Sequence, residues 1–116
     1  MAERRWSNDK ERQLIIAIAA DSAGMDARVS MHAARAPYYL LFNEAGELLE
    51  VVDNPHADAG RGAGPRAAEF LQTKGVTQVI AGEYGHRLVA ELEQRGIGHS
   101  VASGVCTDVM AERMGA

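Results

Sequence analysis

Residues 64–81 read GPRAAEFLQTKGVTQVIA. Pro65 suits the first turn of a helix and Gly75 suits the position just past its end, so the spacing predicts a helix over residues 65–74. The apolar run at residues 76–81 is short and rich in β-branched residues, which predicts a buried strand. A helix that leads directly into a buried strand is typical of α/β domains.

The alternation of helix and strand continues toward the C-terminal end. Residues 85–95 carry apolar residues at helical spacing and stop before Gly96, which predicts a second helix. Residues 99–103 predict a short last strand, and Thr107 is a suitable cap for a final helix that runs to Met114. The helical positions expected to face the core are Ala67, Ala68, Phe70 and Leu71, and then Leu88, Val89 and Leu92.

The N-terminal half predicts strands instead. Residues 13–20 form a continuous apolar run that predicts a buried strand. Residues 38–42 and 48–52 flank a five-residue turn at 43–47 that contains a glycine, which predicts a hairpin. Residues 21–36, between the first two strands, are expected to form a loop with few apolar anchors.

The handedness of chain connections predicts how the strands are ordered. Strand–helix–strand crossovers are right-handed and parallel, whereas the two early connections favour antiparallel neighbours. The sequence therefore predicts a five-stranded mixed sheet of order 3-2-1-4-5, in which strand two is antiparallel to the rest and helices cover both faces. Ligands of such open sheets gather at the carboxyl ends of the parallel strands. Residues 21–35, 54–64, 82–86 and 103–107 are expected at that edge.

Composition limits the classes of protein to consider. The 116 residues fit a polar N-terminal tail at residues 1–12 and a single domain at residues 13–116. The one cysteine excludes an internal disulfide. The longest apolar run, Leu14–Ala20, is too short to span a bilayer, so we expect a cytoplasmic protein without a membrane segment. The formal charge of −4 argues against a nucleic-acid partner.

Basic side chains nevertheless gather in the predicted loops and helix starts. They are Arg28, His32, Arg35, Arg61, Arg66, His86 and Arg87. This distribution suits a small anionic ligand better than a polymer, although scattered surface charge would give a similar pattern.

The loop before the second strand has an uncommon composition, because residues 30–39 read SMHAARAPYY. Further motifs of small residues follow at regular places along the chain. With the first strand they are Ile15–Ala20, Asn54-Pro55, Gly62-Ala63-Gly64, Val79-Ile80-Ala81-Gly82, Gly96-Ile97 and Gly104. In order and spacing this set resembles the dinitrogenase iron-molybdenum cofactor-binding family of nitrogenase accessory proteins. The resemblance covers about residues 13–114.

The resemblance implies a small stand-alone member with a ribonuclease-H-like motif. Such a protein would bind, carry or scaffold a molybdenum-containing metal–sulfur cluster, of the iron–molybdenum or molybdenum–copper type, without catalysis. Its partners would be proteins that donate or accept the cluster, and it would be a monomer or a weak homodimer.

The resemblance also implies two cluster-binding residues. His32 matches the histidine, and Arg35 the arginine, of the family pattern Ser-x-His-Phe-Gly-Arg. Imidazole is a competent metal ligand, and arginine supplies charge and hydrogen bonds to an anionic cluster. Ala33-Ala34 stands where the family has Phe-Gly. This replacement removes an aromatic anchor and a residue that readily adopts positive φ.

Glycines and a cysteine complete the candidate site. Gly62, Gly64, Gly82 and Gly85 precede helices, where exposed backbone N–H groups can bind an anion, although ordinary turns use the same residues. Cys106 stands just before a helix start, where the pKa of a thiol can be lowered, so it is a second candidate metal ligand. A buried and inert cysteine is the alternative.

Two other classes of function remain open from the sequence. Asp21 and Glu83 follow neighbouring strands and could converge to hold divalent metals, as in a nuclease-like enzyme. A metal-free module that binds a partner protein is also possible. No serine has a histidine and a carboxylate at a recognisable catalytic spacing, so we expect a protein that is not an enzyme.

Overall fold

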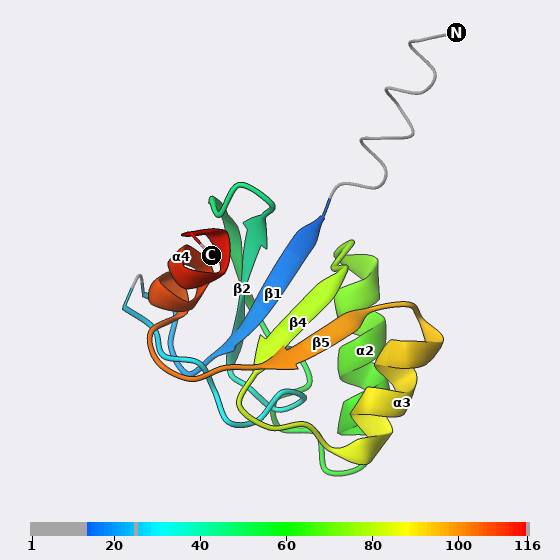
Figure 1. Cartoon of the computed structure of the whole chain (residues 1–116). Coiled ribbons are helices and arrows are strands. Elements are labelled where there is room, and N and C mark those ends of the chain that lie inside the picture. Colours follow the sequence, from blue (N-terminus) through cyan, green and yellow to red (C-terminus); the bar gives the residue numbers. More distant parts are fainter. Residues whose placement is uncertain (1–13, 25, 116) are drawn as a thin grey trace, which may run out of the picture.

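The computed structural model describes residues 14–24 and 26–115 as a five-stranded sheet with three helices (Figure 1). The strands are β1 (Ile15–Ala20), β2 (Tyr38–Asn43), β3 (Leu48–Asp53), β4 (Gln78–Ala81) and β5 (Gly98–Val101). The helices are α2 (Ala63–Thr73), α3 (His86–Gln94) and α4 (Cys106–Gly115). The predicted tail at residues 1–12 lies outside the described residues. No helix in the described ranges is long and apolar enough to cross a membrane.

The sheet has the predicted topology. Its order is β3-β2-β1-β4-β5, which confirms the order 3-2-1-4-5. Strand β2 is antiparallel to β1 and to β3, whereas β1, β4 and β5 run parallel. The early hairpin and the two later crossovers therefore follow the connection rules used for the prediction.

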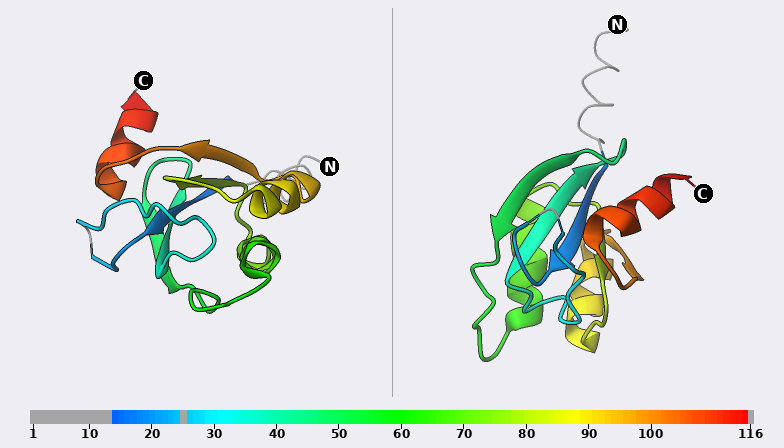
Figure 2. Two further views of the ribbon diagram at one scale, coloured as in Figure 1. Left: turned by 90° about the horizontal axis from the view of Figure 1, so that it is seen from below. Right: turned by 90° about the vertical axis from the view of Figure 1, so that its left-hand side faces the viewer.

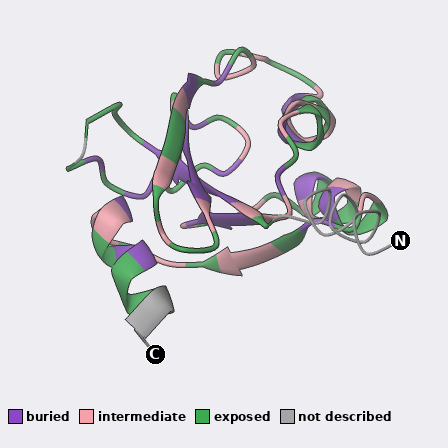
Figure 3. Ribbon diagram, turned by 90° about the horizontal axis from the view of Figure 1, so that it is seen from above, coloured by how far each residue is buried: buried purple, intermediate pink, exposed green. Residues whose placement is uncertain are grey.

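Helices cover both faces of the sheet, because the central strands are apolar on both sides. Ala17 and Ala19 of β1 face the core beneath α2 and α3, whereas Ile16, Ile18 and Ala20 face the core beneath α4. Figure 2 shows α4 on the opposite side of the sheet from α2 and α3. Buried residues, purple in Figure 3, follow the central strands and the inner sides of the helices.

Some element boundaries differ from the prediction. Helix α2 begins two residues early, because Gly62 adopts a left-handed conformation (φ +73°) that starts the helix ahead of Pro65. Strand β5 begins one residue early and already ends at Val101. Thr107 does not precede α4 as predicted, since the helix begins at Cys106 and Thr107 lies in its first turn.

Two predicted core positions are only half-buried. Phe70 lies at the side of α2, where its ring contacts Tyr39 and His56 with centroid distances of 6.3 and 6.4 Å. Val89 is also half-buried on α3, whereas Leu88 and Leu92 are fully buried. The inward face of each helix is therefore narrower than its apolar pattern suggested.

The loop at residues 21–36 is better anchored than predicted. Among its described residues, 21–24 and 26–36, five are buried, namely Ala27, Val29, Ser30, Ala33 and Ala36. The backbone N–H of Ser30 donates to the Ala19 carbonyl at 2.8 Å, and the Ser30 carbonyl accepts from the Gly82 N–H at 2.8 Å. Residues 29–32 consequently lie between the carboxyl ends of β1 and β4, and they join the loop to the sheet.

Gly82 is required by this close approach of the loop. A Cβ atom at Gly82 would lie 2.6 Å from the Met31 Sδ and 2.9 Å from the Met31 Cα. Both distances are shorter than ordinary contacts, and the second involves backbone. Gly82 therefore supports the site by allowing the loop to pair with the end of β4.

Candidate functional site

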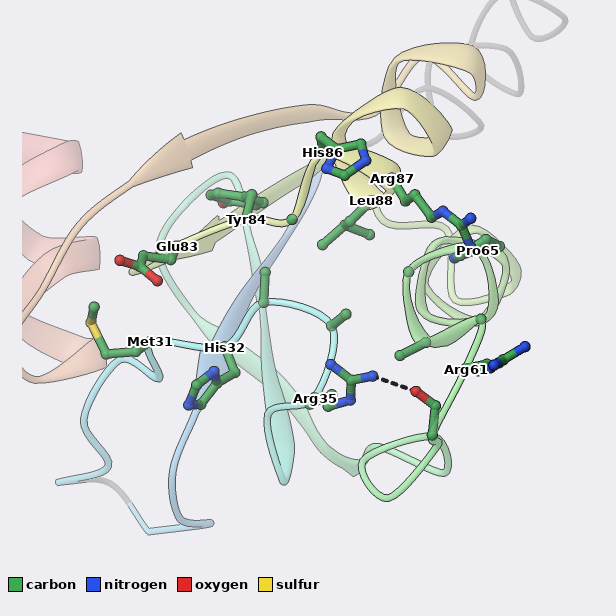
Figure 4. Close-up of a pocket in the computed structure, with 17 residues that line it drawn as sticks. Met31, His32, Arg35, Arg61, Pro65, Glu83, Tyr84, His86, Arg87 and Leu88 are labelled. Carbon is green, nitrogen blue, oxygen red and sulfur yellow. Dashed lines mark hydrogen bonds between the residues drawn. The ribbon is translucent and has the colours of Figure 1, made fainter.

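A cleft of about 620 Å³ lies at the carboxyl edge of the sheet, where the topology predicts a ligand (Figure 4). Three segments form its walls, namely residues 31–35, 60–65 and 83–88. They follow β1, β3 and β4, so strand ends far apart in sequence meet at one place. Of the residues proposed from the sequence, the cleft is lined by His32, Arg35, Gly62, Gly64 and Gly85, but not by Gly82 or Cys106.

The cleft is cationic although the whole chain is acidic. Arg35, Arg61 and Arg87 line it together with His32 and His86, and all five side chains are exposed. Glu83 is the one carboxylate among the lining residues. Positive charge on a concave surface raises the local concentration of anions. Arg61, Arg87 and His86 were noticed in the sequence only as part of a charge pattern.

The N-termini of two helices reach the same cleft. Gly62 precedes α2 and Gly85 precedes α3, and neither helix has a side-chain cap. The first-turn N–H groups of a helix have no partner within the helix, and the helix dipole makes that end electropositive. Both starts lie close together, because a Cβ on Gly64 would be 3.0 Å from the Leu88 backbone nitrogen.

Two tyrosine hydroxyls hold the backbone around the cleft. Tyr39 donates a 2.6 Å hydrogen bond to the Ala33 carbonyl, and burial raises the pKa of Tyr39, so its hydroxyl remains a donor. The Tyr84 hydroxyl lies 3.0 Å from the Val79 carbonyl and 2.5 Å from the Ser100 carbonyl. Burial also raises the pKa of Tyr84, to about 12. Both phenol hydroxyls therefore stabilise the backbone around the cleft by hydrogen bonds to carbonyl groups.

The Ala33-Ala34 replacement does not leave the loop unanchored. Ala33 is buried, and its N–H donates to the Glu83 carbonyl at 3.2 Å. No residue other than glycine has positive φ in the described chain, so residue 34 does not need the missing glycine. The backbone before it is also fixed, because the His32 N–H donates to the Ser30 Oγ at 3.1 Å.

Asn54 is a supporting residue that the sequence interpretation missed. Its buried Nδ2 donates to the carbonyls of Ala34 and Ala36, both at 2.9 Å. Its Oδ1 accepts from the His56 N–H at 2.9 Å. In the sequence, Asn54-Pro55 contributes to the family resemblance and fits a turn after a strand, but neither observation predicts a buried side chain that holds the loop. Its signal was the asparagine that directly follows β3.

The Arg35 side chain reaches from the wall segment 31–35 to the start of the wall segment 60–65. Its Nε donates to the Ala59 carbonyl at 3.1 Å and its Nη2 donates to the Gly60 carbonyl at 2.7 Å. The second bond is drawn in Figure 4. The arginine therefore joins the loop after β1 to the loop after β3.

Cys106 lies far from this chemistry. It is the first residue of α4 and is fully buried in the core with Ile18, Phe42 and Met110, on the opposite face of the sheet from α2 and α3. The prediction of a lowered pKa is wrong, because burial raises the pKa of the Cys106 thiol to about 11. The thiol also does not line the cleft, so it lies apart from the other candidate ligands.

We expect the Cys106 thiol to react at least about a hundredfold more slowly with a disulfide reagent at pH 8 than the same protein does in concentrated guanidinium chloride. Because the folded pKa exceeds the ordinary value of 9.0, the stability from the neutral thiol is fully present below pH 9 and is lost as the pH rises toward 11. Urea unfolding at pH 8 and pH 10 measures this loss, which should be smaller in Cys106→Ala. Rapid labelling of the native protein would contradict the buried position.

The structure does not bring Asp21 and Glu83 together. Glu83 lines the cleft, but Asp21 does not, and residues 29–32 lie between the strand ends that carry them. In the described part of the chain, no group of three or more histidine, cysteine, aspartate or glutamate side chains could hold a metal ion. The convergence expected for a two-metal nuclease site is therefore wrong.

Comparisons with known proteins give one family and several similar folds. Residues 14–113 match the family model described as "Dinitrogenase iron-molybdenum cofactor". The apo form of the orange protein from Desulfovibrio gigas is 27% identical, with a TM-score of 0.78 over 85% of this chain and 84% of that chain. The solution structure of a putative NifB protein from Thermotoga is 30% identical, with a TM-score of 0.68 over 87% and 90%. No curated protein sequence matches significantly.

Proposed function

Because this chain belongs to the dinitrogenase iron-molybdenum cofactor family, we propose that it binds and carries a molybdenum-containing metal–sulfur cluster without catalysing a reaction. The cluster is the cargo of the protein. We propose that one domain at residues 13–116 performs this task and that its sheet is of the ribonuclease-H-like kind. The sheet order and the single antiparallel strand support that assignment.

The observation that carries the proposal is the cationic cleft in an acidic chain. Three arginines, two histidines and two uncapped helix N-termini line one cavity of about 620 Å³, while the formal charge of the chain is −4. This volume lies within the usual range of small-molecule sites. Metal–sulfur clusters of this type are anionic, so such a cleft attracts them and excludes most cations.

We assign a different role to each part of the cleft. His32 is the proposed metal ligand, because imidazole binds iron and copper and this ring is exposed in the cleft. Arg61 and Arg87 supply charge to the sulfide surface. The backbone N–H groups at the starts of α2 and α3, beside Gly62 and Gly85, are hydrogen-bond donors to the cluster sulfides.

The similar proteins support the same class of function. One is described as the apo form of the orange protein and another as a putative NifB protein. We propose that this chain exchanges its cluster with donor or acceptor proteins and acts as a monomer or weak homodimer. Whether the metal beside molybdenum is iron or copper follows from the analysis of the loaded protein.

Anaerobic reconstitution tests the proposal. The chain is incubated with tetrathiomolybdate and either ferrous iron or copper(I), freed of excess metal, and analysed for metal content and visible absorption. We expect His32→Ala to retain at least about tenfold less metal, since one good ligand contributes more than about 1.4 kcal/mol. Its thermal midpoint without cargo should match the parent, because the His32 side chain is exposed.

His99→Ala is the matched control, because it removes an imidazole that does not line the cleft. It should retain the metal content of the parent. Equal metal content in His32→Ala and the parent would contradict the ligand assignment. A parent chain that retains neither metal, with either pair of reagents, would contradict the carrier function and favour a metal-free interaction module.

A further inference from the structure

We infer that Arg35 is a positioning residue, which fixes the spacing between the two walls of the cleft through its paired hydrogen bonds to Ala59 and Gly60. We call the two hydrogen bonds from Arg35 to the Ala59 and Gly60 carbonyls the clamp. The inference rests on the proposed function for the effect of the clamp on cargo binding, but the clamp itself is a property of the cargo-free chain. It gives Arg35 a task different from the direct cluster contact that the family pattern implies.

The geometry of the guanidinium carries the inference. Its Nε and Nη2 donate to two consecutive carbonyl oxygens, at 3.1 and 2.7 Å, from the wall 24 and 25 residues away in sequence. These bonds occupy one side of the planar fork. The gripped residues immediately precede Arg61 and Gly62, so the clamp determines where the cationic wall and the start of α2 lie relative to His32.

The other end of Arg35 is fixed as well. The carbonyls of its two neighbours, Ala34 and Ala36, both accept hydrogen bonds from the buried Nδ2 of Asn54. The Asn54 N–H in turn donates to the Pro37 carbonyl at 3.0 Å. Since the backbone on either side of Arg35 is held, the guanidinium transmits a fixed distance from the sheet to the far wall.

The segment gripped by Arg35 has few other bonds to hold it. The backbone bonds of residues 56–62 are local, from the Ala57 N–H to the Asn54 carbonyl at 3.2 Å, from the Ala59 N–H to the His56 carbonyl at 3.0 Å, and from the Arg66 N–H to the Gly62 carbonyl at 3.1 Å. Asp58, Gly60 and Arg61 are exposed. Asn54 joins His56 to the loop carrying His32, and the two bonds from Arg35 add the connection farther along the segment, at Ala59 and Gly60.

The Arg35→Lys substitution distinguishes the effect of the two hydrogen bonds from the effect of the positive charge. Arg35→Lys keeps the positive charge, but an ammonium group is a point donor and does not reproduce a planar two-point contact. If Arg35 acted through charge alone, lysine would substitute well. Arg66→Lys is the matched control, because Arg66 is exposed on α2 and does not line the cleft.

Hydrogen exchange of the cargo-free chain tests the clamp directly. In Arg35→Lys, we expect amides of residues 57–62 to exchange about tenfold faster, the factor that corresponds to about 1.4 kcal/mol. Exchange in β1 and β4 should stay at the parent rate, and Arg66→Lys should match the parent throughout. Parent-like exchange at residues 57–62 in Arg35→Lys would overturn the clamp.

Binding of tetrathiomolybdate, followed by its absorbance in equilibrium dialysis, tests the consequence. We expect about tenfold weaker binding by Arg35→Lys and parent affinity for Arg66→Lys. Faster exchange with unchanged affinity would overturn the claim that the clamp sets the cleft for its cargo. A parent chain that does not bind the probe would count against the proposed function, whereas the exchange rates would still decide whether the clamp exists.

Discussion

Replacing Asn54 by Asp is expected to destabilise the folded chain by about 3 kcal/mol at pH 8. The substitution turns the buried donor of two hydrogen bonds into an ionised oxygen that faces the Ala34 and Ala36 carbonyls. Both carbonyls would lose their donor, and the new charge would have no cationic partner among the hydrogen bonds of this site. Urea unfolding followed by circular dichroism measures the change.

Asn43→Asp is the matched control for Asn54→Asp. Asn43 is half-exposed in the hairpin, and its Oδ1 accepts from the Ala45 and Glu47 N–H groups, which aspartate can also do. Aspartate loses only the exposed bond from the Asn43 Nδ2 to the Glu47 Oε1. We expect a loss of less than about 1 kcal/mol there. The deficit of Asn54→Asp should shrink at pH 5, because a protonated carboxyl can donate one of the two bonds. A deficit equal to that of Asn43→Asp would contradict the buried network.

The double variant Arg61→Glu/Arg87→Glu is expected to bind the tetrathiomolybdate dianion at least about a hundredfold more weakly at low salt. Reversing both charges changes the cleft by four units, each worth about 0.7 kcal/mol against a unit charge about 6 Å away in water. Both side chains are exposed, so the fold should persist. The difference from the parent should narrow as salt is raised, because exposed charges are screened.

Arg28→Glu/Arg113→Glu provides the control for net charge. It lowers the formal charge of the chain by the same four units, but neither arginine lines the cleft. We expect affinity within about threefold of the parent, since the charges are remote from the bound anion. Equal losses in the two double variants would mean that overall charge, rather than the cleft, determines binding.

The sheet order could be predicted from the sequence because connection rules leave few alternatives. Residues 14–20 are continuously apolar, residues 76–81 are rich in β-branched and apolar residues, and the predicted helices at residues 65–74 and 85–95 both stop at a glycine. The helix boundary at α2 differs from the prediction because a local backbone conformation determines it. Gly62 adopts a left-handed conformation that no composition rule foresees, and this starts α2 earlier than Pro65 suggested.

The site was predicted in part, for a similar reason. The carboxyl edge follows from topology, and the basic residues there follow from their positions in loops. The insertion of residues 29–32 between strand ends could not be predicted, because it depends on the absence of a side chain at Gly82. The same insertion lies between the strand ends that carry Asp21 and Glu83, so the predicted convergence of these two side chains is wrong. The lowered pKa expected for the Cys106 thiol is wrong, because burial raises this pKa by more than the helix start lowers it.

Two helix starts meet at Gly64, so part of the cleft is built from backbone N–H groups, which side-chain substitutions do not remove. Backbone amides persist whatever side chain a codon specifies, so alanine scanning of residues 62–64 and 85–88 would remove none of these donors. Related chains could therefore vary at the exposed positions 85–87 and still present the same backbone donors. Sequence divergence around the cleft should overstate the divergence of what it binds, whereas Gly64 itself has little freedom to change.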